Sequence, residues 1–263
     1  MQSRKGRPRG GPARRQSAIG DFVLAQGSAT AADLAEHFQV SLMTIHRDLD
    51  ELQRQGIVRK FRGGATAQRS GVFESNIAYR TKSMRAEKDA IAHKALELVE
   101  PGMAIMLDDS TTALALARHL ETITPLTVVT NFLDGLNLLA TARGIRLVAL
   151  GGDYDPLHNS FLGVSCVEAI ESLQVDMCFT STSAVSGGHA SHQEPHVVIV
   201  KRAMLQSAEQ NILLVDHTKL GRIALHKVAP LTAFERVIVD DGASADALRD
   251  LAERKVNYDV ALR

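Results

Sequence analysis

The amino-acid sequence predicts a mixed α/β fold, in which an N-terminal winged helix-turn-helix is followed by a doubly wound, mostly parallel α/β domain. Two observations support this prediction. Near the N-terminus, amphipathic helical patterns are separated by a two-residue turn and are followed by a short basic strand. From residue 83 onward, short apolar runs alternate with helical patterns, which is typical of a parallel sheet covered by helices on both faces.

Charge and composition narrow the possible functions. The 263 residues carry no net charge, but residues 1–69 contain 12 Lys and Arg against 6 Asp and Glu, so this part is at +6 and the remainder at −6. The basic N-terminal quarter is therefore a candidate surface for a polyanion. Cys166 and Cys178 form no CxxC pair, and no apolar run reaches the roughly 18 residues of a membrane span. We expect a cytoplasmic protein with no membrane partner.

Four segments are predicted along the chain. Residues 1–13 are rich in Arg, Gly and Pro and should form a disordered basic arm. Their "KGRPRGG" resembles an AT-hook, which binds the DNA minor groove, although a solubilising cationic tail is the favoured interpretation. Residues 14–69 form the winged helix-turn-helix, residues 70–82 a polar linker, and residues 83–263 the α/β domain.

The helix-turn-helix contains three predicted helices. The first runs from about Arg15 to Ala25, the second follows Thr30 as a plausible N-cap, and the third starts at Ser41 and stops before Gly56. The apolar stripes that should form the core are Ile19, Phe22 and Val23, then Leu34, Ala35 and Phe38, then Ile45, Leu49 and Leu52. Only a two-residue turn separates the second helix from the third.

The third helix and the basic strand after it favour DNA binding. The polar N-terminal end of a recognition helix enters the major groove, where Arg47 could pair with guanine, and wing cations contact phosphates. The predicted DNA-contacting residues are Ser41, Met43, Thr44, His46, Arg47, Arg59, Lys60, Arg62 and Gly63. The alternative, a packing unit with a solvated charged face, is disfavoured by the helix order and the local charge. Asp48 is expected to hold Arg47 or a helix terminus in place.

Polar residues follow several predicted strands of the α/β domain. Ligands of doubly wound sheets bind outside the carboxyl ends of the strands. "MAIML" is followed by "DDSTT", "LTVVT" by Asn131, "IRLVAL" by two glycines, and "NILLV" by Asp216 and Lys219. Each of these residues could instead be a helix cap, a turn or a solvated side chain. Together they favour a pocket for an anionic polyol, with hydroxyls and free amides at a helix N-terminus suited to a phosphate.

"SLMTIHRDLDELQRQG" followed by "RKFRGGA" resembles the signature of the DeoR family of bacterial transcriptional regulators, and the resemblance covers nearly the whole chain from about residue 14. It implies an effector domain similar to ribose-5-phosphate isomerase. The matching motifs are Asp108 to Thr112, Thr130-Asn131, Leu150 to Gly152, Asp216 to Lys219, and "VKRAML". The ligand-binding residues so predicted are Asp108, Ser110, Thr111, Thr112, Thr130, Asn131, Gly151, Gly152, Lys201 and Lys219.

The chain departs from the family pattern at several positions. His46 replaces the usual arginine, and Ser110 replaces a glycine, so its loop cannot easily adopt a positive φ. His189, His192 and His196 stand where acidic residues are more usual. With Glu194 they could suggest a metal site, but Gly188, Ser191 and Pro195 disfavour the helix that this spacing requires. A polyol or phosphate contact, or a solvated loop, is favoured, and we predict neither a metal nor a cofactor.

These observations predict a regulator rather than an enzyme. We expect a repressor of a carbohydrate or polyol catabolic operon that binds double-stranded operator DNA as at least a homodimer. A phosphorylated sugar or sugar alcohol bound in the effector and oligomerisation domain should modulate its DNA affinity. The alternative is an isomerase-like enzyme with Asp109 or Glu194 as base, but "CFTSTSAV" lacks the acidic run expected after that strand. A third possibility, constitutive DNA architecture, predicts no response to small molecules.

Overall fold

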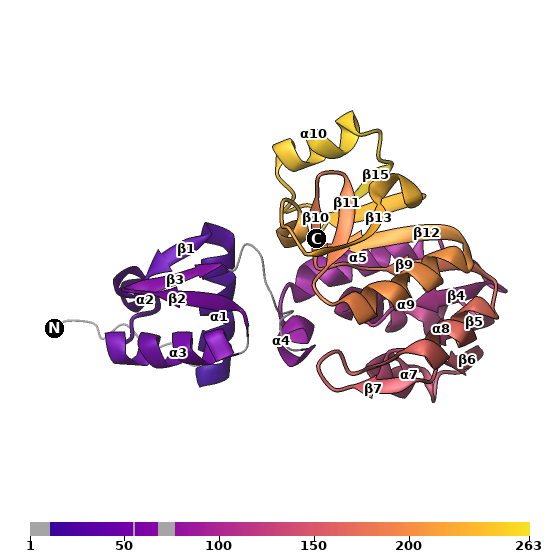
Figure 1. The fold of residues 1–263 in the computed structure, drawn as a ribbon, viewed down its shortest axis with the longest axis horizontal. Helices are drawn as coiled ribbons and strands as arrows, with labels where there is room; N and C mark the ends of the chain where they lie inside the picture. The colour runs from indigo at the N-terminus through magenta and orange to yellow at the C-terminus, as the bar shows by residue number, and fades with distance from the viewer. Residues whose placement is uncertain (1–10, 55, 68–76) are drawn as a thin grey trace. The chain divides into compact units, whose positions relative to one another are not determined.

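The structure, a computed structural model, describes residues 11–54, 56–67 and 77–263. The chain divides into two compact units, Met1–Ser83 and Met84–Arg263, which are described separately (Figure 1). The "KGRPRGG" arm lies almost entirely outside the described residues, as does most of the expected linker. No helix in the described part of the chain combines the length and apolar character needed to cross a membrane.

The N-terminal unit has the predicted winged helix-turn-helix fold. It contains α1 (Pro12–Gln26), α2 (Ala31–Phe38) and α3 (Leu42–Arg54), with an antiparallel sheet of β1 (Ser28–Thr30), β2 (Val58–Phe61) and β3 (Gly64–Ala67) in the order β1-β3-β2. The first helix begins at Pro12 rather than Arg15, because proline is favoured in the first turn of a helix. Strand β1 was not predicted.

Local signals fix the helix ends of this unit. The Thr30 hydroxyl accepts the N–H of Asp33 at 3.1 Å and caps α2, as predicted. Gly56 has a φ of +71°, which glycine adopts at little cost, and it ends α3 as expected. The three predicted apolar stripes meet in one core, whose fully buried members include Ile19, Leu34, Ile45, Leu49 and Leu52.

The C-terminal unit contains a seven-stranded sheet in which all neighbours are parallel, in the order β15-β14-β12-β9-β4-β5-β6 (Figure 1). The strands are β4 (Ala104–Leu107), β5 (Leu126–Thr130), β6 (Ile145–Ala149), β9 (Val175–Thr180), β12 (Ala208–Val215), β14 (Arg236–Asp240) and β15 (Tyr258–Ala261). The first six correspond to the six predicted apolar runs. The doubly wound parallel prediction is confirmed, and edge strand β15 is an addition to it.

Helices cover both faces of this sheet, and α8 and α9 lie together over one of them (Figure 1). The helices are α5 (Arg85–Leu96), α6 (Thr111–Ala117), α7 (Leu133–Leu139), α8 (Val164–Glu171), α9 (Pro195–Gln206) and α10 (Ala245–Glu253), with 3₁₀ turns η1 (Leu120–Thr122), η2 (His217–Lys219) and η3 (Leu231–Ala233). Separate apolar clusters form beneath them, one around Leu116 and Phe179 and another around Met106 and Cys166. A further short helix, α4 (Ile77–Lys82), occupies part of the expected linker.

Two smaller sheets, neither of which was predicted, complete the unit. Strands β7 (Asp153–Asp155) and β8 (Ser160–Leu162) form a hairpin, and β10 (Ala184–Ser186), β11 (His189–His192) and β13 (His226–Pro230) form an antiparallel sheet. Gly152 enters the hairpin with a φ of +140°, and a Cβ there would lie 2.2 Å from the carbonyl oxygen of Leu162. Glycine is therefore required for the close approach of the two strands.

The order of the strands marks one position as special. From β4 the chain adds β5 and β6 on one side, and then β9, β12, β14 and β15 on the other. The carboxyl end of β4 is therefore the topological switch point, which is where ligands bind in open α/β sheets. The segment at that point is Asp108, Asp109 and Ser110.

Candidate DNA-binding surface and effector site

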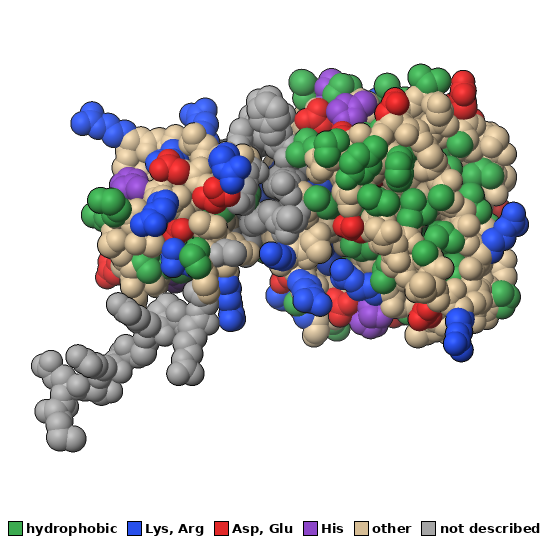
Figure 2. Space-filling view, turned by 90° about the horizontal axis from the view of Figure 1, so that it is seen from below, with side chains coloured by type: hydrophobic (Ala, Val, Ile, Leu, Met, Phe, Trp, Pro, Cys, Tyr) green, Lys and Arg blue, Asp and Glu red, His purple; other side chains and the backbone are tan. Residues whose placement is uncertain are grey.

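The outward face of α3 carries the side chains predicted to read DNA. Met43 is 74% exposed, and His46 and Arg47 are also exposed, whereas Ile45 is completely buried. Figure 2 shows Lys and Arg side chains standing out from the N-terminal unit. The Ser41 hydroxyl accepts the Thr44 N–H at 3.2 Å and lies 2.9 Å from the Thr44 hydroxyl, so it caps α3 as predicted and engages Thr44.

The wing is the hairpin of β2 and β3, with Gly63 at φ +96° in its turn. Arg59 and Arg62 are exposed there, as a phosphate contact requires. Lys60 differs from the expectation, because its ammonium pairs with Asp50 of α3 and its backbone N–H donates to Gln53 Oε1 at 2.9 Å. Lys60 therefore joins the wing to α3, which leaves its charge partly neutralised.

Asp48 has a different partner from the one predicted. It is 2% exposed, and Arg15 of α1 donates from Nε to Asp48 Oδ2 at 2.6 Å and from Nη2 to Oδ1 at 3.2 Å. Gln16 adds a third hydrogen bond at 3.0 Å. Of the two expected roles, holding Arg47 is wrong, whereas holding a helix terminus is close to what is found, because Arg15 and Gln16 lie near the N-terminal end of α1. The Asp48 carboxylate fixes α3 against α1, and Arg47 keeps its guanidinium at the surface.

At the switch point, Asp108 is the centre of a buried polar network. Its Oδ1 accepts the Ser110 N–H at 3.0 Å. Its Oδ2 accepts the Thr180 hydroxyl at 2.6 Å, the Ser181 N–H at 2.7 Å and the ammonium of Lys201. Four donors thus occupy one carboxylate, which leaves little capacity for a further hydrogen bond.

Lys201 of α9 lies between two carboxylates. It is 3% exposed and contacts Asp108 and, at 3.2 Å, Asp109 Oδ1, while Asp109 Oδ2 accepts the Ser160 hydroxyl at 2.9 Å. Burial alone would lower the pKa of Lys201, but the two carboxylates outweigh it and raise the pKa well above its ordinary value. The ammonium is therefore charged, and two carboxylates with one ammonium give the cluster a formal charge of −1.

The loop after β4 does not need the glycine that is usual in the family. Ser110 adopts φ −91°, an extended conformation open to any residue, and its hydroxyl accepts the Ala113 N–H at 3.0 Å. It therefore caps α6. Thr111 and Thr112 follow in the first turn and are 7% and 3% exposed, so the structure brings these predicted residues beside the Asp108 network but beneath the surface.

The residues after β5 and β9 include buried polar atoms without a protein partner among the described residues. Asn131 is fully buried, and its Nδ2 donates to the Phe161 carbonyl at 2.9 Å, but its Oδ1 accepts nothing. Ser183 Oγ is also buried and has no hydrogen-bond partner among the described residues. The Thr130 hydroxyl, in contrast, accepts the Phe132 N–H at 3.1 Å. Unsatisfied buried polar groups at the carboxyl ends of strands are costly, and a hydroxyl-rich ligand could pair with them.

The other predicted ligand residues differ in their surroundings. Gly151 is exposed with open space around it, whereas Gly152 is required by the hairpin. Asp216 caps η2 by accepting the Thr218 N–H at 3.1 Å. Burial raises the pKa of Asp216, but Lys219 and other nearby cations outweigh it and lower the pKa below its ordinary value. Lys219 is half-buried and lies near enough to Asp216 to favour its charged form.

Of the three histidines that were grouped in sequence, His192 and His196 both contact the ring of His158, with ring centroids 5.8 and 6.0 Å away. His189 Nδ1 contacts the Gly187 carbonyl at 3.0 Å, and His192 Nδ1 accepts the Glu194 N–H at 3.1 Å. His196 instead lies in the first turn of α9, where its Nε2 is 3.2 Å from Asp155 Oδ2. Asp155 and His158 of the β7–β8 hairpin had no role in the sequence prediction. Their proximity to α9 arises only from the fold, since Asp155 and His196 are 41 positions apart in the chain.

Comparison with known proteins identifies the family. The DeoR-like helix-turn-helix domain matches residues 15–70, and the DeoR C-terminal sensor domain matches residues 83–241. The chain belongs to the DeoR family. It is a DNA-binding transcriptional regulator in which the N-terminal unit is the DeoR helix-turn-helix and the switch point lies in the DeoR sensor domain.

The chain is also similar to individual regulators and to one solved structure. The helix-turn-helix regulator YgbI of Escherichia coli strain K12 is 34% identical over 95% of this chain and 98% of its own length. The glycerol-3-phosphate regulon repressor of the same organism is 28% identical over 94% and 98%. Ribose 5-phosphate isomerase A of Methanocaldococcus jannaschii is similar at 20% identity and a TM-score of 0.40, covering 52% of this chain and 55% of its own. This last likeness is too weak to indicate activity.

Proposed function

We propose that this DeoR-family regulator represses a carbohydrate or polyol catabolic operon, and that a phosphorylated sugar or sugar alcohol bound at the switch point changes its affinity for operator DNA. The observation that supports DNA binding is the exposed face of α3. His46 and Arg47 lie on this face, near the N-terminal end that Ser41 caps. The relative named for the glycerol-3-phosphate regulon supports the class of operon.

The charge at the switch point suggests how the effector is oriented. The cluster of Asp108, Asp109 and Lys201 carries −1, so it repels a phosphate and favours hydroxyl donors. Asn131 Oδ1 and Ser183 Oγ have hydrogen-bonding capacity to offer the same hydroxyls. We therefore assign the polyol end of the effector to this cluster. Its phosphate belongs toward the remaining predicted residues, Thr111, Thr112, Gly151, Gly152 and Lys219.

We further propose that this site binds without catalysing a reaction. An isomerase requires a carboxylate that is free to move a proton between adjacent carbons. Asp109 already accepts hydrogen bonds from Lys201 and Ser160, and Asp108 accepts from four donors. Glu194 lies outside this network, directly before α9. These engagements favour a rigid recognition site over an acid-base pair.

The functional form is proposed to be at least a homodimer acting in the cytoplasm, where operator DNA is found. Operators with two half-sites require paired recognition helices. Figure 2 shows hydrophobic side chains gathered on one face of the C-terminal unit. Large apolar side chains exposed on that unit include Tyr154 at 51%, Val164 at 72% and Ile199 at 56%. A contiguous exposed apolar patch is typical of a protein interface. Sedimentation velocity of the full chain measures the state directly.

Binding measurements on the full chain test the proposed function. Promoter fragments from the neighbouring genes are titrated with protein, with and without pentose, hexose and triose phosphates, their unphosphorylated forms and phosphorylated sugar alcohols. We expect one phosphorylated compound to raise the Tm and to change the DNA Kd by about 5–150-fold, the usual range of allosteric coupling. Conversion of that compound, followed by NMR, would favour the isomerase instead.

A double variant separates the two sites. Thr111→Val with Thr112→Val removes two hydroxyls while keeping similar volume, so it should abolish the effector response and leave DNA binding intact. Thr232→Val, at an exposed hydroxyl on η3 outside the predicted site, is the matched control. An unchanged effector response in the double variant would move the phosphate away from this loop.

A further inference from the structure

The C-terminal unit places His196, one of the histidines considered from the sequence, beside two metal-ligand side chains that the sequence prediction did not contain. Asp155 ends β7, His158 lies in the turn before β8, and His196 lies in the first turn of α9. Each offers one ligand atom, and these three atoms lie within 4.8 Å of one another. The group therefore bridges two elements that are distant in the chain, the β7–β8 hairpin and the helix that carries Lys201.

The spacing within the group fits a tetrahedral ion. Asp155 Oδ2 is 3.1 Å from His158 Nδ1 and 3.2 Å from His196 Nε2. Zinc ligands at about 2.0–2.1 Å in tetrahedral geometry are separated by about 3.3 Å. The two histidine nitrogens lie within 4.8 Å of each other. Two imidazoles and one carboxylate are ligands that Zn²⁺ accepts, and they leave a fourth position for water or a ligand oxygen.

The surroundings of Asp155 direct its carboxylate toward this centre. Its Oδ1 accepts the Leu157 N–H at 2.7 Å, which leaves Oδ2 facing the two imidazoles. Contacts that orient a ligand in this way raise metal affinity. The side chain of His158 is 1% exposed and that of His196 is 47% exposed, so the group extends from the interior to the surface.

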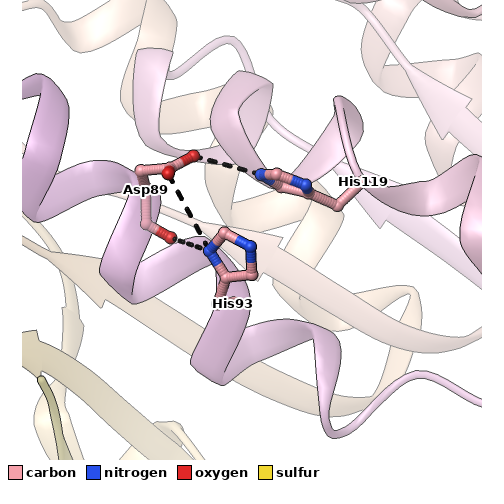
Figure 3. A group of neighbouring side chains, drawn as sticks. All are labelled: Asp89, His93 and His119. Atoms are coloured by element: carbon pink, nitrogen blue, oxygen red, sulfur yellow. Dashed lines mark hydrogen bonds and ion pairs between the residues drawn. The ribbon is translucent and has the colours of Figure 1, made fainter. Parts of the chain in front are cut away.

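A second Asp-His-His group in the described residues provides an internal comparison. Asp89 and His93 of α5 lie beside His119, and Figure 3 shows both rings turned toward the carboxylate. His93 Nδ1 is 2.9 Å from the Asp89 backbone carbonyl and must donate to it, because a carbonyl only accepts. The same nitrogen is 3.9 Å from the Asp89 carboxylate. The longer nitrogen-to-carboxylate distance and the greater exposure of its residues make this group the poorer metal site.

We propose that Asp155, His158 and His196 bind one Zn²⁺ ion that fastens the β7–β8 hairpin to α9. This inference goes beyond the proposed regulatory function and does not depend on the identity of the effector. Both joined elements contact the switch point, since Ser160 of β8 donates to Asp109 and Lys201 of α9 pairs with Asp108 and Asp109. The ion therefore stiffens the wall of the sensor site. Without an ion, the same three side chains form a trio in which each imidazole donates an N–H to Asp155.

Cobalt provides the test, because Co²⁺ takes zinc sites and reports its geometry in the visible spectrum. Full-length untagged protein is stripped with a chelator, titrated with Co²⁺ and then with Zn²⁺ in competition. We expect one ion per chain, a tetrahedral d–d spectrum that Zn²⁺ abolishes, and a higher Tm with Zn²⁺. A thiolate-to-cobalt band would place the ion on a cysteine and overturn the proposal. Burial raises the pKa of the Cys166 thiol to about 11, with Asp109 adding to the rise, so we expect no such band.

Matched variants locate the ion. His196→Ala removes an exposed ligand with little risk to the fold, and Asp155→Asn keeps the acceptor for the Leu157 N–H while removing the charge. Each should weaken Co²⁺ binding by about tenfold or more, a range typical of disturbed metal sites. His119→Ala, in the other group, should change nothing. Equal binding by wild type and His196→Ala, a comparable loss in His119→Ala, or no ion bound by the wild type would overturn the proposal.

Discussion

The two units of the chain use their charged side chains in opposite ways. The N-terminal unit keeps Arg47, Arg59 and Arg62 exposed, and within its described residues it buries one carboxylate, Asp48. The C-terminal unit buries an entire set of ionised side chains, namely Lys88, Asp108, Asp109, Lys201, Asp216 and Asp240. An exposed cation contributes little to folding and remains available to a polyanion. A buried charged side chain is held by partners within the fold, so its removal lowers the free energy of unfolding.

The largest expected effect is at Lys201. Lys201→Met leaves Asp108 and Asp109 buried beside each other without their shared cation, which should cost about 3–5 kcal/mol of unfolding free energy. Urea denaturation of the full chain measures it. Lys227→Met, at an exposed lysine of β13, should stay within about 0.5 kcal/mol. Similar losses in the two variants would show that burial of the charge is not what distinguishes the units.

A smaller effect on stability is expected at the buried ion pair of the N-terminal unit, between Asp48 and Arg15. Asp48→Ala leaves the guanidinium of Arg15 without its carboxylate and should destabilise the N-terminal unit by about 1–3 kcal/mol. Asp50→Ala breaks the exposed pair with Lys60 and should cost at most about 1 kcal/mol. Thermal unfolding of both variants compares the two neighbouring acids. A larger loss for Asp50→Ala would contradict the role assigned to the buried clamp.

For DNA binding the exposed cations should matter while stability is unchanged. Arg47→Ala should weaken operator binding by about 1–3 kcal/mol and relax specificity at one base pair. Arg62→Ala should weaken binding to all sequences alike and reduce the salt slope by about one. Fluorescence anisotropy at several salt concentrations, with operator and random DNA, separates the two. If both variants lose the same affinity on random DNA, Arg47 does not read a base.

The smallest effect concerns a histidine that is only partly exposed. The hydrogen bond from His217 Nδ1 to Asp240 Oδ2, 2.6 Å long, raises the pKa of His217 above its ordinary value of 6.5, although burial opposes the shift. A raised pKa in the folded state stabilises the protein fully below pH 6.5, and this contribution is lost as the pH rises through the folded-state pKa.

Urea titrations at a series of pH values test this linkage. The unfolding free energy of the wild type should fall as the pH rises from about 6 into the mildly alkaline range, and His217→Gln should flatten that fall. His93→Gln, at the surface of α5, serves as the control. An identical pH dependence in His217→Gln and wild type would show that His217 does not cause the fall in stability.

The sequence predicted the frame of both units because its strongest signals are periodic. The runs around Ile105, Val128 and Leu213 were long and apolar enough to identify central strands, and Thr30 and Ser41 are sequence-local caps. The β7–β8 hairpin and the β10–β11–β13 sheet were missed, because strands of three to five residues such as "DYD" and "HASH" carry no clear period.

The sequence predicted which residues belong to the candidate sites, but not which of them form ion pairs or hydrogen bonds with one another. The Asp108 loop and Lys201 were both selected from strand-end and family patterns, yet nothing in the sequence shows that Asp108 would accept Lys201, 93 positions away. The same applies to Asp48 and Arg15 and to Asp155 and His196. Long-range ion pairs depend on how elements pack, and packing is decided by shape rather than by local periodicity.

The clamp from Arg15 to Asp48 has a practical consequence for anyone who shortens this protein. The cationic arm ends only a few residues before Arg15, so a cut intended to remove the arm could also remove the guanidinium that steadies the recognition helix. Such a shortened chain would bind DNA poorly for a reason unrelated to the arm. A cut placed before Pro12 keeps α1 whole and would attribute any lost affinity to the arm alone.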